Sequence, residues 1–82
     1  MVRADEFPAL KSQRVLSMLE RLGYSELRRK GSHRRLVADA RPPLTFAYHE
    51  GGEVPPKALR HLLMVQVGLT EDETRQLLGR RR

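Results

Sequence analysis

The sequence predicts an α+β fold, with one antiparallel sheet of three strands and helices before and after it gathered on one face. Leucine-rich segments with helical spacing stand on both sides of a central region of short alternating segments and turn formers. With 82 residues, of which 39% are hydrophobic, the chain has apolar material for one small core. We therefore expect a single domain at 11–78, after a flexible extension at 1–10 and before a basic tail at 79–82.

The first helix is expected directly after the N-terminal extension. Ser12 is a suitable N-cap, and Gly23 supplies a C-terminal stop. Between these two residues the apolar side chains recur at helical spacing, at Val15, Leu16, Leu19 and Leu22. This spacing predicts a helix that buries one leucine-rich face.

Three strands are expected after this helix. Residues 24–30 and 33–38 suit two short strands, and Gly31 and Ser32 between them are turn formers. A loop over 39–43 then leads to the third strand, in which apolar and polar side chains alternate. The apolar set, which we expect to be buried, is Leu44, Phe46 and Tyr48, and the opposite face carries Thr45, Ala47 and His49.

Two more helices complete the predicted fold. Pro55 and Pro56 suit the start of the second helix, because the first helical residues do not need an amide proton. Gly68 ends this helix, and its buried stripe is formed by Leu59, Leu62, Leu63 and Val67. Thr70 and Glu73 then have the spacing of a capping box, which predicts a short third helix through Leu77 and Leu78.

Positive charge is concentrated in the predicted hairpin. The chain has 16 lysines and arginines against 10 aspartates and glutamates, which gives a formal net charge of +6. Between Arg28 and Arg41 there are six basic residues and a single acidic residue, Asp39. This excess favours an anionic partner, with nucleic acid as the first candidate and an acidic protein surface as the second.

One histidine, His33, lies inside this basic run. An unperturbed imidazole titrates near pH ~6.5, so it can exchange a proton with a ribose hydroxyl near neutral pH. We interpret Ser32 as a turn former or a phosphate hydrogen-bond donor, since no catalytic triad is recognisable. His61 is expected to face solvent on the second helix. The basic side chains around His33 can hold RNA phosphates by charge, and they are Arg28, Arg29, Lys30, Arg34 and Arg35.

The composition argues against several other classes of protein. The sequence has no cysteine, which removes disulfides, thiolate nucleophiles and cysteine zinc sites and is typical of a reducing compartment. The three histidines are not accompanied by carboxylates at the spacing of metal ligands, so we expect no metal site. The sequence has no glycine-rich phosphate loop, so we expect no cofactor. No apolar run approaches the ~20 residues that cross a bilayer, and Asp5 and Glu6 do not fit an export signal. A cytoplasmic protein is expected.

The chain from about Lys11 to Leu78 resembles the HicA-type mRNA interferase toxins. Its leucine-rich first helix closes on Gly23 and Tyr24, and the run from Arg29 to His33 contains the Gly-Ser-His motif of that family. Further matching positions follow at His49, Glu53, Val54, Pro55, Leu59, Leu63, Gly68 and Leu69. The chain departs from the family pattern at two places. Ala47 stands where the family usually has proline, and Lys57 and Ala58 stand where it usually has a Gly-Thr pair.

This resemblance implies a fold similar to the double-stranded RNA-binding domain and a toxin that cleaves mRNA. It also implies a partner, a HicB-type antitoxin that covers the active site. RNA carries its own nucleophile, the 2′-hydroxyl, so cleavage of this kind needs proton transfer and phosphate positioning and no metal ion. The alternatives are a noncatalytic RNA-binding module of the same fold and a protein-binding adaptor.

On this interpretation His33 is the catalytic acid or base, and His49 is a possible second proton carrier. Lys30 and Arg34 would stabilise the charge that develops on the reacting phosphate. The flanking phosphates would be bound by Arg28, Arg29, Arg35 and Lys57. Little base specificity is expected, because this fold meets RNA mainly through backbone and 2′-hydroxyl contacts.

Overall fold

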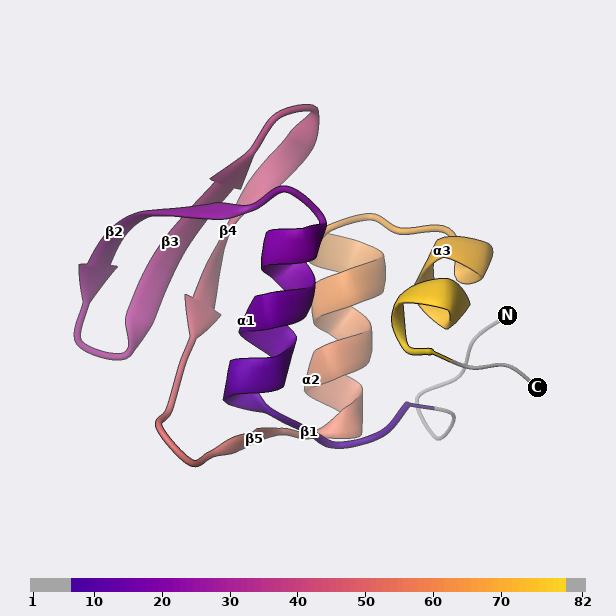
Figure 1. Cartoon of the computed structure of the whole chain (residues 1–82), viewed down its shortest axis with the longest axis horizontal. Helices are drawn as coiled ribbons and strands as arrows, with labels where there is room; N and C mark the ends of the chain where they lie inside the picture. Colours follow the sequence, from indigo (N-terminus) through magenta and orange to yellow (C-terminus); the bar gives the residue numbers. More distant parts are fainter. Residues whose placement is uncertain (1–6, 80–82) are drawn as a thin grey trace.

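A computed structural model describes residues 7–79 of the chain. One helix, a three-stranded antiparallel sheet and two further helices follow one another, which confirms the predicted α+β order (Figure 1). Helices α1 and α2 lie side by side against one face of the sheet, and α3 lies on the far side of α2. The elements are β1 Leu10–Lys11, α1 Ser12–Arg21, β2 Ser25–Lys30, β3 His33–Ala38, β4 Arg41–Ala47, β5 Glu53–Val54, α2 Pro56–Arg60, its π-helical continuation η2 His61–Gln66, and α3 Glu71–Leu77.

Helix α1 begins differently from the prediction. Ser12 is the first helical residue and not the N-cap, which is Lys11, and no side chain among residues 7–79 caps this end. The backbone N–H of Ser12 donates to the carbonyl oxygen of Gly52 at 2.9 Å. This contact follows from the antiparallel pairing of β1 with β5, in which Leu10 lies opposite Val54. A carbonyl group 40 residues later in the chain therefore satisfies one of the free N–H groups at this end of the helix, where the sequence analysis expected the Ser12 side chain to act as the cap.

Residues 7–10, which the sequence analysis placed in a flexible extension, are part of the packed structure. Phe7 is 4% exposed and belongs to the hydrophobic core, and Leu10 packs against that core and pairs with Val54. Burying an aromatic ring contributes enough hydrophobic free energy to hold a short segment without regular structure. Residues 1–6 and the basic residues 80–82 of the predicted tail lie outside the described part of the chain.

The hairpin of β2 and β3 has the predicted two-residue turn. Gly31 has φ +59°, while Ser32 has a negative φ, which is the pattern of a turn with glycine at its first central position. Between β3 and β4 the predicted loop over 39–43 is wrong, because β4 already begins at Arg41. Pro42 and Pro43 lie in this strand, and β4 tolerates them because it is at the edge of the sheet.

Strand β4 also ends earlier than predicted, at Ala47, so Tyr48 and His49 follow the strand. Tyr24, placed between α1 and β2, is buried, and its hydroxyl donates to the carbonyl oxygen of Pro42 at 2.7 Å. Burial raises the pKa of this phenol, with Arg41 partly opposing the shift, so the hydroxyl remains a donor. The bond ties the start of β2 to β4 across the sheet.

The C-terminal helices follow the sequence pattern closely. The predicted leucine stripe is buried, and Gly68, with φ +84°, follows the end of η2. The capping box at α3 is confirmed: Thr70 Oγ1 accepts from the Glu73 N–H at 3.1 Å, and Glu73 accepts from the Thr70 N–H at 2.9 Å. The π-helical turns of η2 have no signal in the sequence. Within residues 7–79 no helix is long and apolar enough to cross a membrane.

Candidate functional site

The register of the sheet divides the basic run onto two faces. Leu36 is buried against the helices, so its side chain marks the inner face of the sheet. Residues that lie directly opposite each other on neighbouring strands point to the same face. Arg34 lies on the inner face, opposite Arg29 and Phe46, and His33 lies on the outer face, opposite Lys30 and Ala47. The sequence analysis treated these basic residues as one cluster, and the alternation of the strands separates them.

A bulge in β2 determines on which face the Glu26 carboxylate lies. Glu26 pairs with Leu36 and Arg28 pairs with Arg35, so Leu27 is an extra residue between two regular pairs. In an unbroken strand residues 26 and 28 would share a face, but the bulge places Glu26 on the inner face and Arg28 on the outer face. The outer face is thereby left without this carboxylate.

On the inner face the arginines are engaged by the protein itself. Glu26 accepts hydrogen bonds from Arg29 at 3.1 Å and from Arg34 at 3.4 Å. The hydrogen bond from Arg29 lowers the pKa of the Glu26 carboxyl, and the charge of Arg34 acts in the same direction. The Arg34 guanidinium also lies 4.2 Å from the centre of the Tyr48 ring, and this arginine side chain is only 17% exposed. Arg34 is therefore a packed residue.

Arg34 and Tyr48 also fix the end of the sheet where His33 lies. The Tyr48 N–H donates to the carbonyl oxygen of Ser32 at 2.8 Å, and the Tyr48 ring contacts Phe46 edge to face at 6.4 Å between centroids. The Arg34 guanidinium lies over the Tyr48 ring, and Arg34 is the residue that follows His33 in β3. The turn residue Ser32 is half-buried, and its carbonyl oxygen accepts the hydrogen bond from Tyr48. Its hydroxyl group has no hydrogen-bond partner among residues 7–79.

The outer face carries a compact group of cations around the predicted catalytic histidine. We call Arg28, Lys30, His33 and Arg35 the outer basic cluster; together with Thr45 they line a shallow hollow of about 120 Å³. Arg35 donates to Thr45 Oγ1 at 3.2 Å, which orients its guanidinium. Within residues 7–79 none of the four forms an ion pair with a carboxylate, and His33 is exposed. This hollow can accept an anion.

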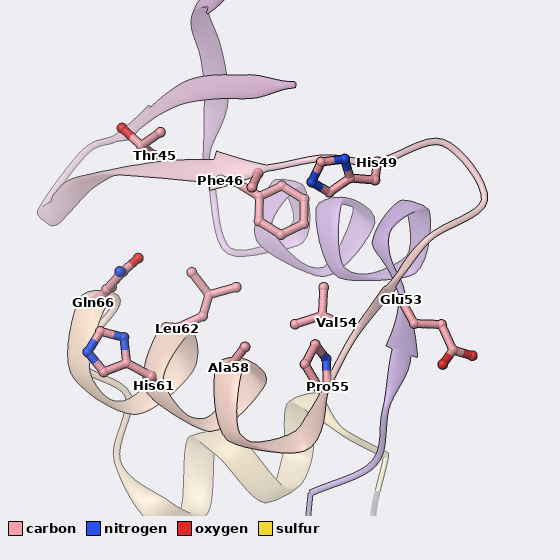
Figure 2. Close-up of a pocket in the computed structure, with 11 residues that line it drawn as sticks. Thr45, Phe46, His49, Glu53, Val54, Pro55, Ala58, His61, Leu62 and Gln66 are labelled. Atoms are coloured by element: carbon pink, nitrogen blue, oxygen red, sulfur yellow. The ribbon is translucent and has the colours of Figure 1, made fainter. Parts of the chain in front are cut away.

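A second hollow of about 320 Å³ lies between β4 and α2 (Figure 2). We call it the β4–α2 groove. Its floor is apolar, with Phe46, Val54 and Leu62 all buried, and His49 and His61 lie at its rim. The sequence analysis gave His61 to solvent, and it is exposed, but no sequence signal indicated that it would share a groove with His49.

The other sequence-predicted site residues are more dispersed. His49 lines the β4–α2 groove and His33 lines the outer hollow, and Thr45 is the residue common to the two. The structure therefore does not bring the two histidines into one cavity. Lys57, exposed on α2, lines neither hollow. Among residues 7–79 no three His, Cys, Asp or Glu side chains converge as metal ligands.

A comparison with protein families agrees with the resemblance seen in the sequence. The family model described as the HicA toxin of bacterial toxin-antitoxin systems matches residues 12–69. This match begins at the first residue of α1, ends after η2 and includes both hollows. Neither the curated proteins nor the solved structures contain a significant match. Because the family model covers well over half of the chain, this protein belongs to the HicA toxin family of bacterial toxin-antitoxin systems.

Proposed function

We propose that this toxin is an mRNA interferase, an endoribonuclease that cleaves RNA without a metal ion. RNA binds on the outer face of the sheet, and His33 exchanges a proton with the reacting groups. The observation that carries the proposal is the outer basic cluster: an exposed histidine surrounded by three cations that have no carboxylate partner among residues 7–79. The proposed substrate is mRNA in the cytoplasm.

The electrostatic argument rests on cross-strand pairs. Arg28 lies directly opposite Arg35, and Lys30 lies directly opposite His33. The like charges of Arg28 and Arg35 destabilise a sheet in this position, so a purely structural role does not account for this pair. The inner pair, Arg29 and Arg34, shares the Glu26 carboxylate, whereas within residues 7–79 the outer pair, Arg28 and Arg35, has no carboxylate partner. A phosphate in the outer hollow would relieve the repulsion, and this supports an anionic ligand there.

The proposed reaction uses groups that the RNA and this face supply. The ribose 2′-oxygen attacks the adjacent phosphorus, a new P–O2′ bond forms and the P–O5′ bond breaks. His33 takes the proton of the 2′-hydroxyl as general base, and water protonates the leaving 5′-oxygen. In the other order His33 delivers a proton to the leaving 5′-oxygen, and water takes the proton of the 2′-hydroxyl. Lys30, opposite His33, is placed to stabilise the negative charge on the non-bridging oxygens.

The proposal gives the other basic residues different roles according to the face on which they lie. Arg28 and Arg35 bind flanking phosphates, and Lys57 adds a separate contact from α2. Arg34 and Arg29 support the sheet instead, because both are bound to Glu26. His49 remains a predicted second proton carrier, to be tested by its own substitution.

The decisive test is cleavage of single-stranded RNA by the full chain in the presence of a chelator. Wild type is expected to cut RNA and leave DNA of the same sequence intact, because DNA lacks the 2′-hydroxyl. His33→Ala is expected to lower the rate by about 10²- to 10⁴-fold while RNA affinity stays near wild type. His61→Ala, which removes another exposed imidazole, serves as the matched control and should cleave normally.

Three results would contradict the proposal. A requirement for a divalent metal, or equal cleavage of DNA, would exclude the proposed chemistry. Full activity of His33→Ala would exclude His33 and direct attention to His49. RNA binding by wild type without any cleavage would favour the noncatalytic RNA-binding module.

A further inference from the structure

We propose that the free edge of β4, together with the β4–α2 groove, binds an extended peptide strand of the antitoxin in which aliphatic residues alternate with acidic ones. The peptide extends the sheet as a fourth strand. The binding site follows from the geometry of β4 and does not depend on catalysis. The consequence for activity, that the bound strand excludes RNA from the outer face, rests on the function proposed above.

The hydrogen-bond pattern of the sheet leaves donors and acceptors on β4 unused. The sheet order β2-β3-β4 gives β4 one free edge. The bond from the Tyr48 N–H to the Ser32 carbonyl oxygen shows which residues of this segment face β3. Since an antiparallel ladder alternates, Phe46 also bonds to β3, whereas Thr45 and Ala47 direct their N–H and C=O groups away from it.

These unused groups face the groove. Thr45 and Ala47 both line it, although the Thr45 side chain points away from it in Figure 2. They therefore present backbone to the groove. Within residues 7–79 no backbone partner is found for either residue outside the strand ladder. An exposed edge of this kind is a template for another strand, and alternating N–H and C=O groups recognise a peptide backbone in particular.

The groove accounts for one set of side chains of the added strand. Alternate residues of that strand would point to the inner side, where Phe46, Val54 and Leu62 form the floor. On the opposite wall Ala58 is small and exposed, so space remains beside α2. Branched aliphatic side chains suit both the apolar floor and the strand conformation. The inner-facing positions of the peptide are therefore aliphatic.

Charge determines which side chains suit the outward-pointing positions of the added strand. The outward-pointing residues of the added strand would lie beside Thr45 and Ala47, with Arg35 and His33 one strand further. Neighbouring strands are about 4.8 Å apart, so a glutamate there lies within reach of the outer basic cluster. Acidic residues at these positions gain favourable interactions, and lysines would be repelled. The same carboxylates would occupy the place of the RNA phosphates.

Ala47 makes this edge available in the present chain. A proline at this position would remove the N–H that Ala47 directs to the free edge. The substitution Ala47→Pro is thus a direct test, because it deletes one edge donor and no bond to β3. Ala47→Ser keeps the N–H and is the matched control.

The probe is a synthetic peptide of eight residues in which glutamate and valine alternate. Its controls are a peptide of the same composition with the glutamates and valines in two blocks, and a peptide in which lysine replaces glutamate. Binding to the full chain is measured by fluorescence anisotropy, and amide hydrogen exchange is measured residue by residue. The alternating peptide is expected to bind at least tenfold more tightly than either control and to protect the amides of Thr45 and Ala47.

Two variants test the two parts of the site. Ala47→Pro is expected to weaken binding of the alternating peptide about tenfold, and Ala47→Ser to bind as wild type does. Ala58→Tyr fills the groove from α2 at an exposed position and should also weaken binding of the alternating peptide about tenfold. Because peptide binding is measured without RNA, a protein that fails to cleave RNA still tests this proposal.

The proposal is overturned if the alternating and blocked peptides bind equally, or if Ala47→Pro binds the peptide normally. It is also overturned if the two amides become protected by self-association as protein concentration rises, which would identify a second copy as the occupant. Protection of the same amides by single-stranded RNA alone would identify the groove as part of the RNA site.

Discussion

On the inner face of the sheet Arg34 lies over Tyr48 and shares Glu26 with Arg29, whereas on the outer face Arg28 and its neighbours have no carboxylate partner within residues 7–79. The two sets come from the same eight residues of sequence. They differ because strand alternation and the bulge at Leu27 assign each side chain to a face. The basic run is therefore divided into two groups: Arg29 and Arg34 contact other side chains of the protein, and the side chains of the outer basic cluster line a hollow.

Salt dependence of RNA binding gives the largest expected difference between the faces. Replacing Arg28 and Arg35 together by serine removes two phosphate contacts, and each contributes about −0.7 to the log-log slope on single strands. At 0.1 M salt this corresponds to roughly a 25-fold loss of affinity, about fivefold for each contact. The measurement is RNA affinity over a salt series with inactive His33→Ala protein as background.

Two neighbours in the sequence provide the control for this experiment. Arg28→Ser changes the outer face and Arg29→Ser changes the inner face, with the same loss of charge. Arg28→Ser should flatten the slope by about 0.7, and Arg29→Ser should leave it nearly as in wild type. If both variants change the slope equally, RNA does not distinguish the two faces.

Stability should show the opposite ranking. Arg34→Ala removes the contact with the Tyr48 ring and one partner of Glu26, and it opens a space at a side chain that is 17% exposed. We expect a loss of about 1–2 kcal/mol in the free energy of unfolding, measured with urea. Arg35→Ala, on the outer face, should stay within about 0.5 kcal/mol of wild type. Equal losses would mean that Arg34 is no more a structural residue than Arg35.

Local signals explain what could be predicted from the sequence. The Gly31-Ser32 turn, the leucine stripe of α2 and the capping box of Thr70 and Glu73 each depend on residues close together in the chain, and all three are present in the structure. The α+β order follows from such segments because each has one face to bury. His33 was selected as a candidate by its neighbours in the sequence, and the outer hollow forms around it.

Features that depend on long-range pairing were missed. The Ser12 N–H is satisfied by Gly52, and Phe7 is buried by residues that come later in the chain. The place of Glu26 depends on a one-residue bulge, which no composition or periodicity reveals. The β4–α2 groove likewise needs the packing of two elements, so His49 and His61 could not be placed together from the sequence.

Acid stability provides the smallest and most specific test of the inner face. The folded-state pKa of Glu26 is lowered, mainly by the hydrogen bond from Arg29. A carboxylate with a lowered pKa binds fewer protons in the folded state, so its contribution to stability is complete above the unfolded pKa and is lost as pH falls through the folded pKa. Glu26→Gln cannot ionise and lacks this contribution at every pH. Thermal unfolding should therefore show wild type more stable at neutral pH, with the difference shrinking in the acid range.

The control for this comparison is Glu20→Gln, which removes an exposed carboxylate from α1, on another element than the hairpin. Its difference from wild type should be smaller than that of Glu26→Gln at neutral pH. Raising the salt concentration should reduce the effect of Glu26→Gln only in part, because hydrogen bonds between charged groups persist when long-range attraction is screened. If the difference between wild type and Glu26→Gln is the same at pH 7 and at acid pH, Glu26 does not hold the two inner arginines. The separation of the two faces would then rest on the packing of Arg34 against Tyr48 alone.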